Sequence, residues 1–271
     1  MSTVLRFIPP IVQSAMAGIS DRNFCQKILN YGAGMVTLGG FSIDRDSHLA
    51  TSRMIERGRN EFLLQFKVEQ VKSWCLENLN LEKQINHQLV SFNVRLTEID
   101  YFSEVWLKEV SQHVDVIEIN AHCRQEEILK IDGGHNLLIQ TEKLRSLLES
   151  IRKLLPSFPI GIKIRGYIVN DYPKLIEILD DYSISYIHVD AMLPGHKRAN
   201  IQIIRKLVEL TDIPIIGNNS VRTINDIYTM LKAGAKATSI ARPLIQNPKF
   251  IQQLVIDYSG RISNESNNST I

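Results

Sequence analysis

One short segment combines several side chains that can do chemistry. Residues 117–124, IEINAHCR, begin with the alternation of a strand and end in a polar cluster around Cys123. Asn120 and His122 lie beside this cysteine, which is one of only three in 271 residues. A cysteine has a pKa of about 8.5, so a thiol placed here is mostly protonated at neutral pH and can donate a proton. The alternative is a small side chain that is simply packed.

The rest of the chain must position this cluster. Short apolar segments alternate with longer amphipathic ones, and strands separated by helices predict a parallel sheet. The predicted strands are residues 10–16, 34–40, 88–94, 114–120, 159–164, 185–190, 213–218 and 237–241. Eight strand–helix units in about 250 residues predict an α/β fold, a closed (β/α)8 TIM barrel over residues 1–258. An open doubly wound sheet is the alternative, but no G-x-G-x-x-G turn follows the first strand.

Amphipathic segments predict the helices between these strands. They cover residues 21–32, 57–79, 101–113, 141–155, 172–182, 200–210, 223–234 and 247–258. The last residues, 259–271, are polar and are predicted to form a disordered tail.

The carboxyl ends of the predicted strands carry the other candidate residues, because active sites of this barrel class lie there. In strand order these residues are Ala15, Met16, Ala17, Asn93, Asn120, His122, Cys123, Lys163, Arg165, His188, Asp190, Asn218, Asn219, Ser220, Ala241 and Arg242. Cations and amides outnumber carboxylates in this set, which suits an anionic ligand. The loops after the seventh and eighth strands commonly bind phosphate in this fold. Gly217 offers a permissive backbone there, and Arg242 offers a guanidinium.

Several of these residues also have a purely structural interpretation. Lys163, within the apolar segment IGIKI, can hold an ammonium against an electron-rich cofactor, or it can reach solvent from the strand end. His188 is a cofactor contact or a satisfied core histidine, and Asp190 is its partner or a helix-start residue. Cys25 and Cys75 fall in helical patterns and are expected to be inert.

Composition narrows the functional class. The net charge is +2 and 44% of residues are hydrophobic, so no strong overall field indicates nucleic acid or a membrane. The cysteines form no C-x-x-C pair, which argues against a metal site and a disulfide framework. No segment reaches the roughly 18 apolar residues of a membrane span, and the start lacks a signal-like pattern. We therefore expect a reduced, cytoplasmic protein without a membrane partner.

Several motifs, in order, resemble those of the tRNA-dihydrouridine synthases. SAMAGISDRNF is similar to A-P-M-A-G-V-T-D, and INAHCRQEEILKIDGGHNLL to the N-x-G-C-P segment. IGIKIR is similar to V-K-x-R, YIHVDA to H-x-R, IPIIGNNSV to I-P-V-I-x-N-G-D-I, and ATSIARPLIQNP to G-R-x-x-x-x-N-P. The similarity covers about residues 8–250, and it is strongest to the dihydrouridine-synthase-like barrel proteins of archaea.

The resemblance implies FMN, with NAD(P)H as electron donor, and reduction of the C5=C6 bond of uridine in tRNA. Cys123 would be the general acid that protonates C5, and Lys163 would face the N1/O2 edge of the flavin. The other implied cofactor contacts are Ala15, Met16, Ala17, Asn93, His188, Asn218, Asn219, Ser220, Ala241 and Arg242. Asn120, His122 and Arg165 would lie on the substrate side.

The sequence also departs from these motifs. His122 replaces a glycine, Arg124 a proline and Ser220 an aspartate, and Leu38-Gly39 stands in place of T-E-M. About twenty residues follow NPKF, so the usual C-terminal helical tRNA-binding domain is expected to be lacking, and the insert at 53–88 is nearly neutral. Two other interpretations therefore stay open. One is a flavin oxidoreductase acting on a small pyrimidine-like molecule, as dihydroorotate dehydrogenases do, and the other is a flavin- or phosphate-binding barrel without turnover.

Overall fold

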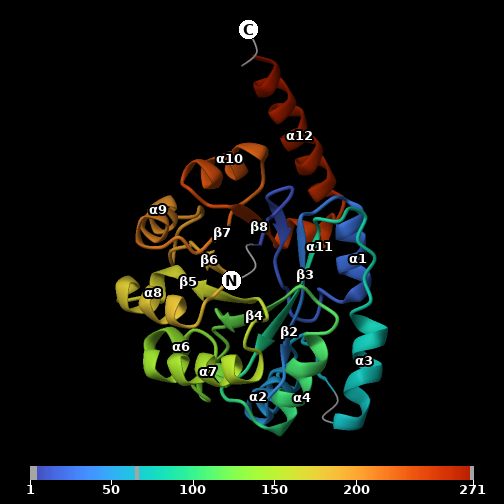
Figure 1. The fold of residues 1–271 in the computed structure, drawn as a ribbon, viewed down its shortest axis with the longest axis vertical. Helices are drawn as coiled ribbons and strands as arrows, with labels where there is room; N and C mark the ends of the chain where they lie inside the picture. The colour runs from blue at the N-terminus through green and yellow to red at the C-terminus, as the bar shows by residue number, and fades with distance from the viewer. Residues whose placement is uncertain (1–4, 65–66, 269–271) are drawn as a thin grey trace.

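The chain folds into a closed barrel surrounded by helices (Figure 1). The computed structural model describes residues 5–64 and 67–268. In these residues eight strands pair in chain order and all in parallel: β1 Ile11–Gln13, β2 Met35–Ser42, β3 Leu89–Arg95, β4 Val116–Ala121, β5 Ile160–Arg165, β6 Tyr186–Asp190, β7 Ile215–Asn218 and β8 Ala237–Ile240. Because β1 pairs with both β2 and β8, the sheet is closed. The predicted (β/α)8 barrel is confirmed and the open sheet is excluded.

Helices alternate with the strands and cover the outside of the barrel. They are α1 Arg22–Asn30, α2 Arg45–Glu56, η1 Val68–Gln70, α3 Val71–Asn78, α4 Tyr101–Val110, α5 Glu126–Leu129, α6 Asn136–Ile139, α7 Thr141–Leu154, η2 Gly166–Ile168, α8 Tyr172–Asp181, α9 Ile201–Leu210, α10 Ile224–Lys232, α11 Arg242–Gln246 and α12 Phe250–Asn268. A continuous apolar core lies between these helices and the strands.

The predicted helix over residues 57–79 is wrong in its first half. Helix α2 comes earlier, because the Asp44 side chain accepts the amide of Ser47 at 3.0 Å and caps its start. Gly58 follows the helix end with a φ of +85°, a left-handed conformation that stops helix propagation. The chain then runs without helix to Leu64, and residues 65–66 lie outside the described part.

The predicted disordered tail over 259–271 differs from the structure, because α12 continues to Asn268 and projects from the barrel (Figure 1). Ile251 and Leu254 anchor the first turns in the core, and an established helix extends at little further cost. Residues 269–271 lie outside the described part. None of the helices described is both long and apolar enough to cross a membrane.

The inside of the barrel changes from apolar to polar along the strands. Every second strand residue points inward. Near the amino ends, an apolar cluster that includes Phe7, Met35 and Tyr186 fills the barrel. Farther along, the buried inward residues are polar or charged: Asn93, Glu118, Lys163, His188 and Ser239. Strand register places Asn93 opposite Glu118 and Lys163 opposite His188, so this polar layer is continuous beneath the carboxyl ends of the strands.

Candidate active site

A cavity of about 950 Å³ opens at the carboxyl ends of the strands. This volume is at the upper end of the range for small-molecule and cofactor sites. The predicted site residues that line it are Ala15, Ala17, Asn120, His122, Cys123, Lys163, Arg165, Asn218, Asn219, Ser220, Ala241 and Arg242. Met16, Asn93 and His188 are not among the lining residues. Met16 lies in a turn where its amide donates to Ser20 Oγ at 2.7 Å.

Positive charge dominates the cavity lining. The cations are Arg59, Arg95, Arg124, Lys163, Arg165, Arg222 and Arg242, and the carboxylates are Glu61 and Asp190. Glu61 pairs with Arg59 and Arg95, and Asp190 pairs with Arg165. In the described residues, no ion pair is formed by the other four cations, Arg124, Lys163, Arg222 and Arg242. Their charge is thus available to an anionic ligand.

Lys163 contributes a buried ammonium to the floor of the cavity. Only 5% of the residue is exposed, so the alternative in which it reaches solvent is wrong. Its Nζ donates to Ser14 Oγ at 2.5 Å. Burial lowers the pKa of Lys163, while the charges of Glu118 and Asp190 oppose that change. An ammonium with one bond to a hydroxyl has further N–H groups for a ligand.

Glu118 lies behind the cavity floor and was missed in the sequence. It is fully buried, and it accepts hydrogen bonds from Asn93 Nδ2 at 2.7 Å, His188 Nδ1 at 2.8 Å and the Tyr186 hydroxyl at 3.1 Å. Burial alone would raise its pKa, but His188, Lys163 and Asn93 outweigh burial and lower it to about 2. The carboxylate is therefore ionised at neutral pH.

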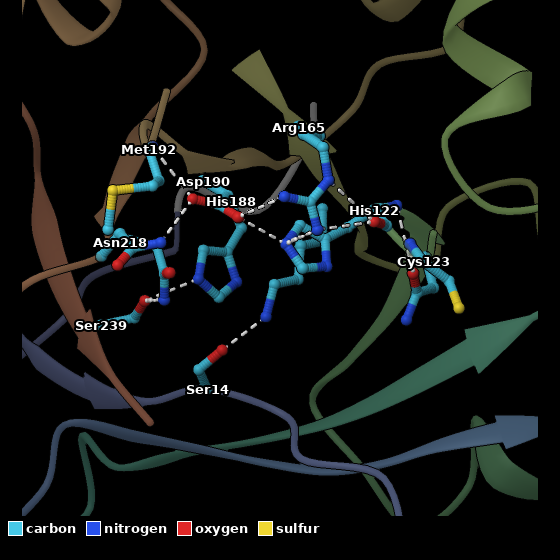
Figure 2. Close-up of polar contacts among 12 residues, drawn as sticks. Ser14, His122, Cys123, Arg165, His188, Asp190, Met192, Asn218 and Ser239 are labelled. Carbon is cyan, nitrogen blue, oxygen red and sulfur yellow. Dashed lines mark hydrogen bonds and ion pairs between the residues drawn. The ribbon is translucent and has the colours of Figure 1, made fainter. Parts of the chain in front are cut away.

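His188 connects this carboxylate to the seventh strand. Burial lowers the pKa of His188 despite Glu118, so the ring is neutral and Nδ1 carries the proton donated to Glu118. Nε2 then accepts from Ser239 Oγ at 2.6 Å, and Ser239 Oγ accepts from Asn218 Nδ2 (Figure 2). Both ring nitrogens are satisfied, which is the arrangement of a core histidine.

Asn120 fixes the loop that carries Cys123. Its Oδ1 accepts from the backbone amides of His122 at 3.1 Å and Cys123 at 2.9 Å, and its Nδ2 donates to Asn93 Oδ1 at 2.8 Å. Cys123 is half-buried and lines the cavity, although it also contacts a small apolar cluster that includes Met54. The geometry thus places Cys123 at the wall of a cationic cavity, and two backbone hydrogen bonds to Asn120 hold its loop.

The other two thiols are remote from this chemistry. Cys25 and Cys75 are fully buried. Burial raises the pKa of Cys25 well above its usual value and that of Cys75 to about 12. Both observations agree with the expectation that these cysteines are inert.

Asp190 organises the wall opposite Ser14. Its Oδ2 accepts from His122 Nε2 at 2.8 Å and Arg165 at 3.1 Å, and its Oδ1 accepts from Asn219 Nδ2 at 2.8 Å and the Met192 amide at 3.0 Å (Figure 2). Both sequence interpretations of Asp190 are wrong, because His188 bonds to Glu118 instead and Asn200 caps α9. Strand register explains why Asp190 pairs with Arg165, since the two residues lie opposite each other on neighbouring strands.

Proton affinities within this cluster follow from its contacts. Burial would raise the pKa of Asp190, but the hydrogen bonds from His122, Asn219 and Met192 hold it well below its usual range. For His122, burial together with Lys163 and Arg165 outweighs Asp190 and lowers the pKa to about 4. His122 is therefore neutral at pH 7. Nε2 lies 2.8 Å from the Asp190 carboxylate and 3.1 Å from Arg165 Nη2; the shorter contact, to a charged acceptor, places the ring proton on Nε2.

The loop after β7 takes the conformation that backbone anion sites favour, although Gly217 is not the residue responsible. Asn219 and Ser220 have φ values of +100° and +60°, whereas a side chain on Gly217 would collide with Met230 Sδ at 2.8 Å. Arg242 approaches Asn219 Oδ1 at 3.4 Å and joins this loop to the end of β8. Gly217 thus leaves room for Met230, and the left-handed turn begins two residues later, at Asn219.

A second wall was also missed, because the sequence predicted a helix there. Asn60 Nδ2 donates to the Gly18 carbonyl at 2.8 Å and ties this segment to the loop after β1. Glu61 lies between Arg95 at 2.5 Å and Arg59 at 3.0 Å. This segment fixes Arg95 at the wall of the cavity.

Known proteins share this sequence and this fold. Residues 12–267 match the family model described as dihydrouridine synthase. An uncharacterized protein of Methanocaldococcus jannaschii is 35% identical over 251 residues, which are 90% of this chain and 93% of that protein. A tRNA-dihydrouridine(47) synthase-like protein of Xenopus laevis is 26% identical over 148 residues, 52% of this chain. The chain covers only 23% of that longer relative.

A solved structure supports the same architecture. The DHODH of Eimeria tenella in complex with ferulenol superposes with a TM-score of 0.64 over 96% of this chain and 82% of its own, at 15% identity. This likeness shows the fold. The family model spans nearly the whole described barrel, in agreement with the motif resemblance. The chain belongs to the dihydrouridine synthase family.

Proposed function

We propose that this protein is an FMN-dependent oxidoreductase that reduces the C5=C6 bond of uridine in tRNA, with NAD(P)H as electron donor. One observation carries the proposal most: Cys123, Lys163 and the cations of the β7 and β8 loops all line one cavity. Family membership supports an oxidoreductase of this type. The name of the Xenopus relative supports tRNA as the substrate.

The cavity fits FMN in size and in charge. Its volume suits a flavin mononucleotide, and Arg222 and Arg242 form no ion pair in the described residues, so they can hold a phosphate dianion with the backbone at Asn219. Lys163 would face the electron-rich edge of the flavin ring, and the small side chain of Ala17 would leave room for that ring at the cavity wall. When bound and reduced, FMN supplies a hydride to C6 of the pyrimidine.

Cys123 completes the reduction by giving its Sγ proton to C5. The ring gains one hydride and one proton, so the C5=C6 π bond is lost and two electrons enter the pyrimidine. The thiolate then takes a proton from solvent. His122 is a poor alternative proton donor, because its ring is neutral and its Nε2–H group is engaged in the hydrogen bond to Asp190. Asn120 holds the cysteine loop through its two backbone hydrogen bonds.

Two measurements test the proposal in sequence. Purified protein should take up FMN and show bands at about 375 and 450 nm. Failure to bind FMN on titration overturns the proposal. Mass spectrometry of tRNA from a deletion strain should then show loss of dihydrouridine, restored by the wild-type chain and not by Cys123→Ala. Bound FMN with unchanged tRNA would refute tRNA as the substrate and direct the search to a small pyrimidine-like molecule.

A further inference from the structure

Glu118 has no part in the chemistry above, yet it joins two opposite sides of the cavity. It is fully buried, and its ionised carboxylate lies between Asn93 and His188. A carboxylate can only accept hydrogen bonds. Each neighbour must therefore present a donor to it, and that requirement sets the direction of every hydrogen bond farther out.

One chain of hydrogen bonds leads from Glu118 to the cysteine loop. Asn93 turns its Nδ2 to Glu118 and so leaves Oδ1 for Asn120 Nδ2 at 2.8 Å. Asn120 in turn leaves its Oδ1 for the backbone amides of His122 and Cys123. If Asn93 were reversed, Asn120 would have to reverse as well. Its NH₂ would then face two N–H donors, and both backbone hydrogen bonds would be lost.

The other chain leads to the cofactor side. The Nδ1–H group of His188 donates a hydrogen bond to Glu118. The Nε2 atom of His188 therefore carries no proton and can only accept, and the Ser239 hydroxyl donates to it. Ser239 Oγ then accepts from Asn218 Nδ2, which fixes the amide of Asn218 at the cavity wall. The tautomer of His188 is thus set by the charge of Glu118.

We propose that Glu118 is a positioning residue that fixes the Cys123 loop through Asn93 and Asn120, and Asn218 through His188 and Ser239. The inference rests on the proposed function for the roles of Cys123 and the cofactor. The hydrogen-bond directions on which it depends belong to the protein alone.

Single substitutions can break the two chains of hydrogen bonds separately. Asn93→Ala breaks only the chain to the cysteine loop, and Ser239→Ala breaks only the chain to Asn218. Glu118→Ala breaks both. Glu118→Gln keeps an oxygen for Asn93 and turns its NH₂ toward His188, so the histidine must change to the Nε2–H tautomer while the cysteine loop stays in place. Tyr186→Phe is the matched control, because it removes the third donor to Glu118 and neither chain.

Three measurements are made on each variant, and thermal unfolding checks that each variant is folded. Alkylation of the native apoprotein reports Cys123, because Cys25 and Cys75 are fully buried. Fluorescence titration with FMN reports the cofactor side. Nitrogen NMR of the imidazole rings reports the tautomer of His188.

We expect Asn93→Ala to raise the alkylation rate about tenfold, the worth of a lost buried hydrogen bond, with FMN affinity nearly unchanged. Ser239→Ala should weaken FMN about tenfold with an unchanged alkylation rate, and Glu118→Ala should do both. Glu118→Gln should alkylate like the wild type and show Nε2–H at His188. Tyr186→Phe should match the wild type in all three.

Two results would overturn the inference: an unchanged alkylation rate in Asn93→Ala, or an unchanged His188 tautomer in Glu118→Gln. If Glu118→Ala does not fold, the single-chain variants and Glu118→Gln still decide. A wild-type protein that binds no FMN would refute the proposed function instead, and the alkylation and NMR results would still test Glu118.

Discussion

Acidification should destabilise this protein through His122, which the structure keeps neutral. Its pKa is lowered to about 4, whereas a histidine in an unfolded chain has a pKa of about 6.5. Because the folded value is the lower one, the unfolded state binds more protons between pH 6.5 and pH 4. The free energy of unfolding must therefore fall as the pH drops through this window. It is unaffected by His122 above pH 7.

The size of the effect follows from these two values. Between pH 7 and pH 5, linkage gives a loss of about 2 kcal/mol from His122 alone. His188 acts in the same direction, because burial lowers its pKa as well. A loss of this size is a substantial part of the stability of an ordinary domain.

Urea unfolding at pH 7, 6 and 5 measures the loss, and His122→Gln isolates the residue. Glutamine can still donate to Asp190 but does not titrate, so the variant should lose about 2 kcal/mol less than the wild type over the same range. His87→Gln is the control, because His87 is exposed and does not line the cavity. Proton NMR of the imidazole C–H signals gives the His122 midpoint directly.

A His122 midpoint near 6.5, with the same pH dependence in His122→Gln and wild type, would refute this account. Imidazolium would then form close to neutral pH beside Cys123. The assignment of the cysteine as sole proton donor would lose its support from the Asp190 cluster.

Three further expectations concern the cavity itself. Lys163→Met and Arg242→Ala should each lower the affinity for FMN about ten- to a hundredfold in fluorescence titrations. Arg205 is an exposed cation on α9, so Arg205→Ala should leave the affinity unchanged. If all three variants bind FMN with the same affinity, the phosphate site lies elsewhere. Cys123→Ala should keep FMN and its reduction by NAD(P)H but slow single-turnover substrate reduction by about 10²–10⁴, and near-full turnover would remove its role as acid. Asp190→Asn should cost about 3 kcal/mol in urea unfolding, because it leaves the buried Arg165 without its carboxylate, and an unaltered midpoint would contradict that pairing.

The barrel could be predicted because its signals are local. Each strand is a short apolar run, each helix carries its own apolar stripe, and the rule for strand ends then assembles the cavity. The same period of two would have found Glu118, since it lies two residues before Asn120 and so points to the same side of β4. The rule for strand ends selects residues that follow each strand, and Glu118 lies within β4.

Other parts of the site depend on contacts that no local pattern contains. Asp190 stands two residues from His188, yet its partners His122 and Arg165 come from the ends of β4 and β5. Glu61 is held by Arg95 from a different strand end, and its segment has the charge pattern of a surface helix. Pairings of this kind are settled by register and by the path of a loop, which only the folded chain supplies.

Departures from the family motifs are connected in space. His122 stands in place of a glycine, Asp190 in place of the arginine of H-x-R, and Asn219 in place of the glycine of N-G-D. All three meet at one carboxylate, where His122 and Asn219 each donate at 2.8 Å. An arginine at position 190 would instead bring a second guanidinium against Arg165, which now lies 3.1 Å from the carboxylate.

His122, Asp190 and Asn219 therefore form one set of hydrogen bonds in which the first and third residues donate and Asp190 accepts. The carboxylate of Asp190 offsets Arg165, and two neutral donors satisfy its remaining lone pairs. The hydrogen bond to Asp190 also helps to hold Asn219 in a left-handed conformation that would otherwise favour glycine. Together these three residues give the wall beside Cys123 a neutral imidazole at a position where the family motif has no side chain.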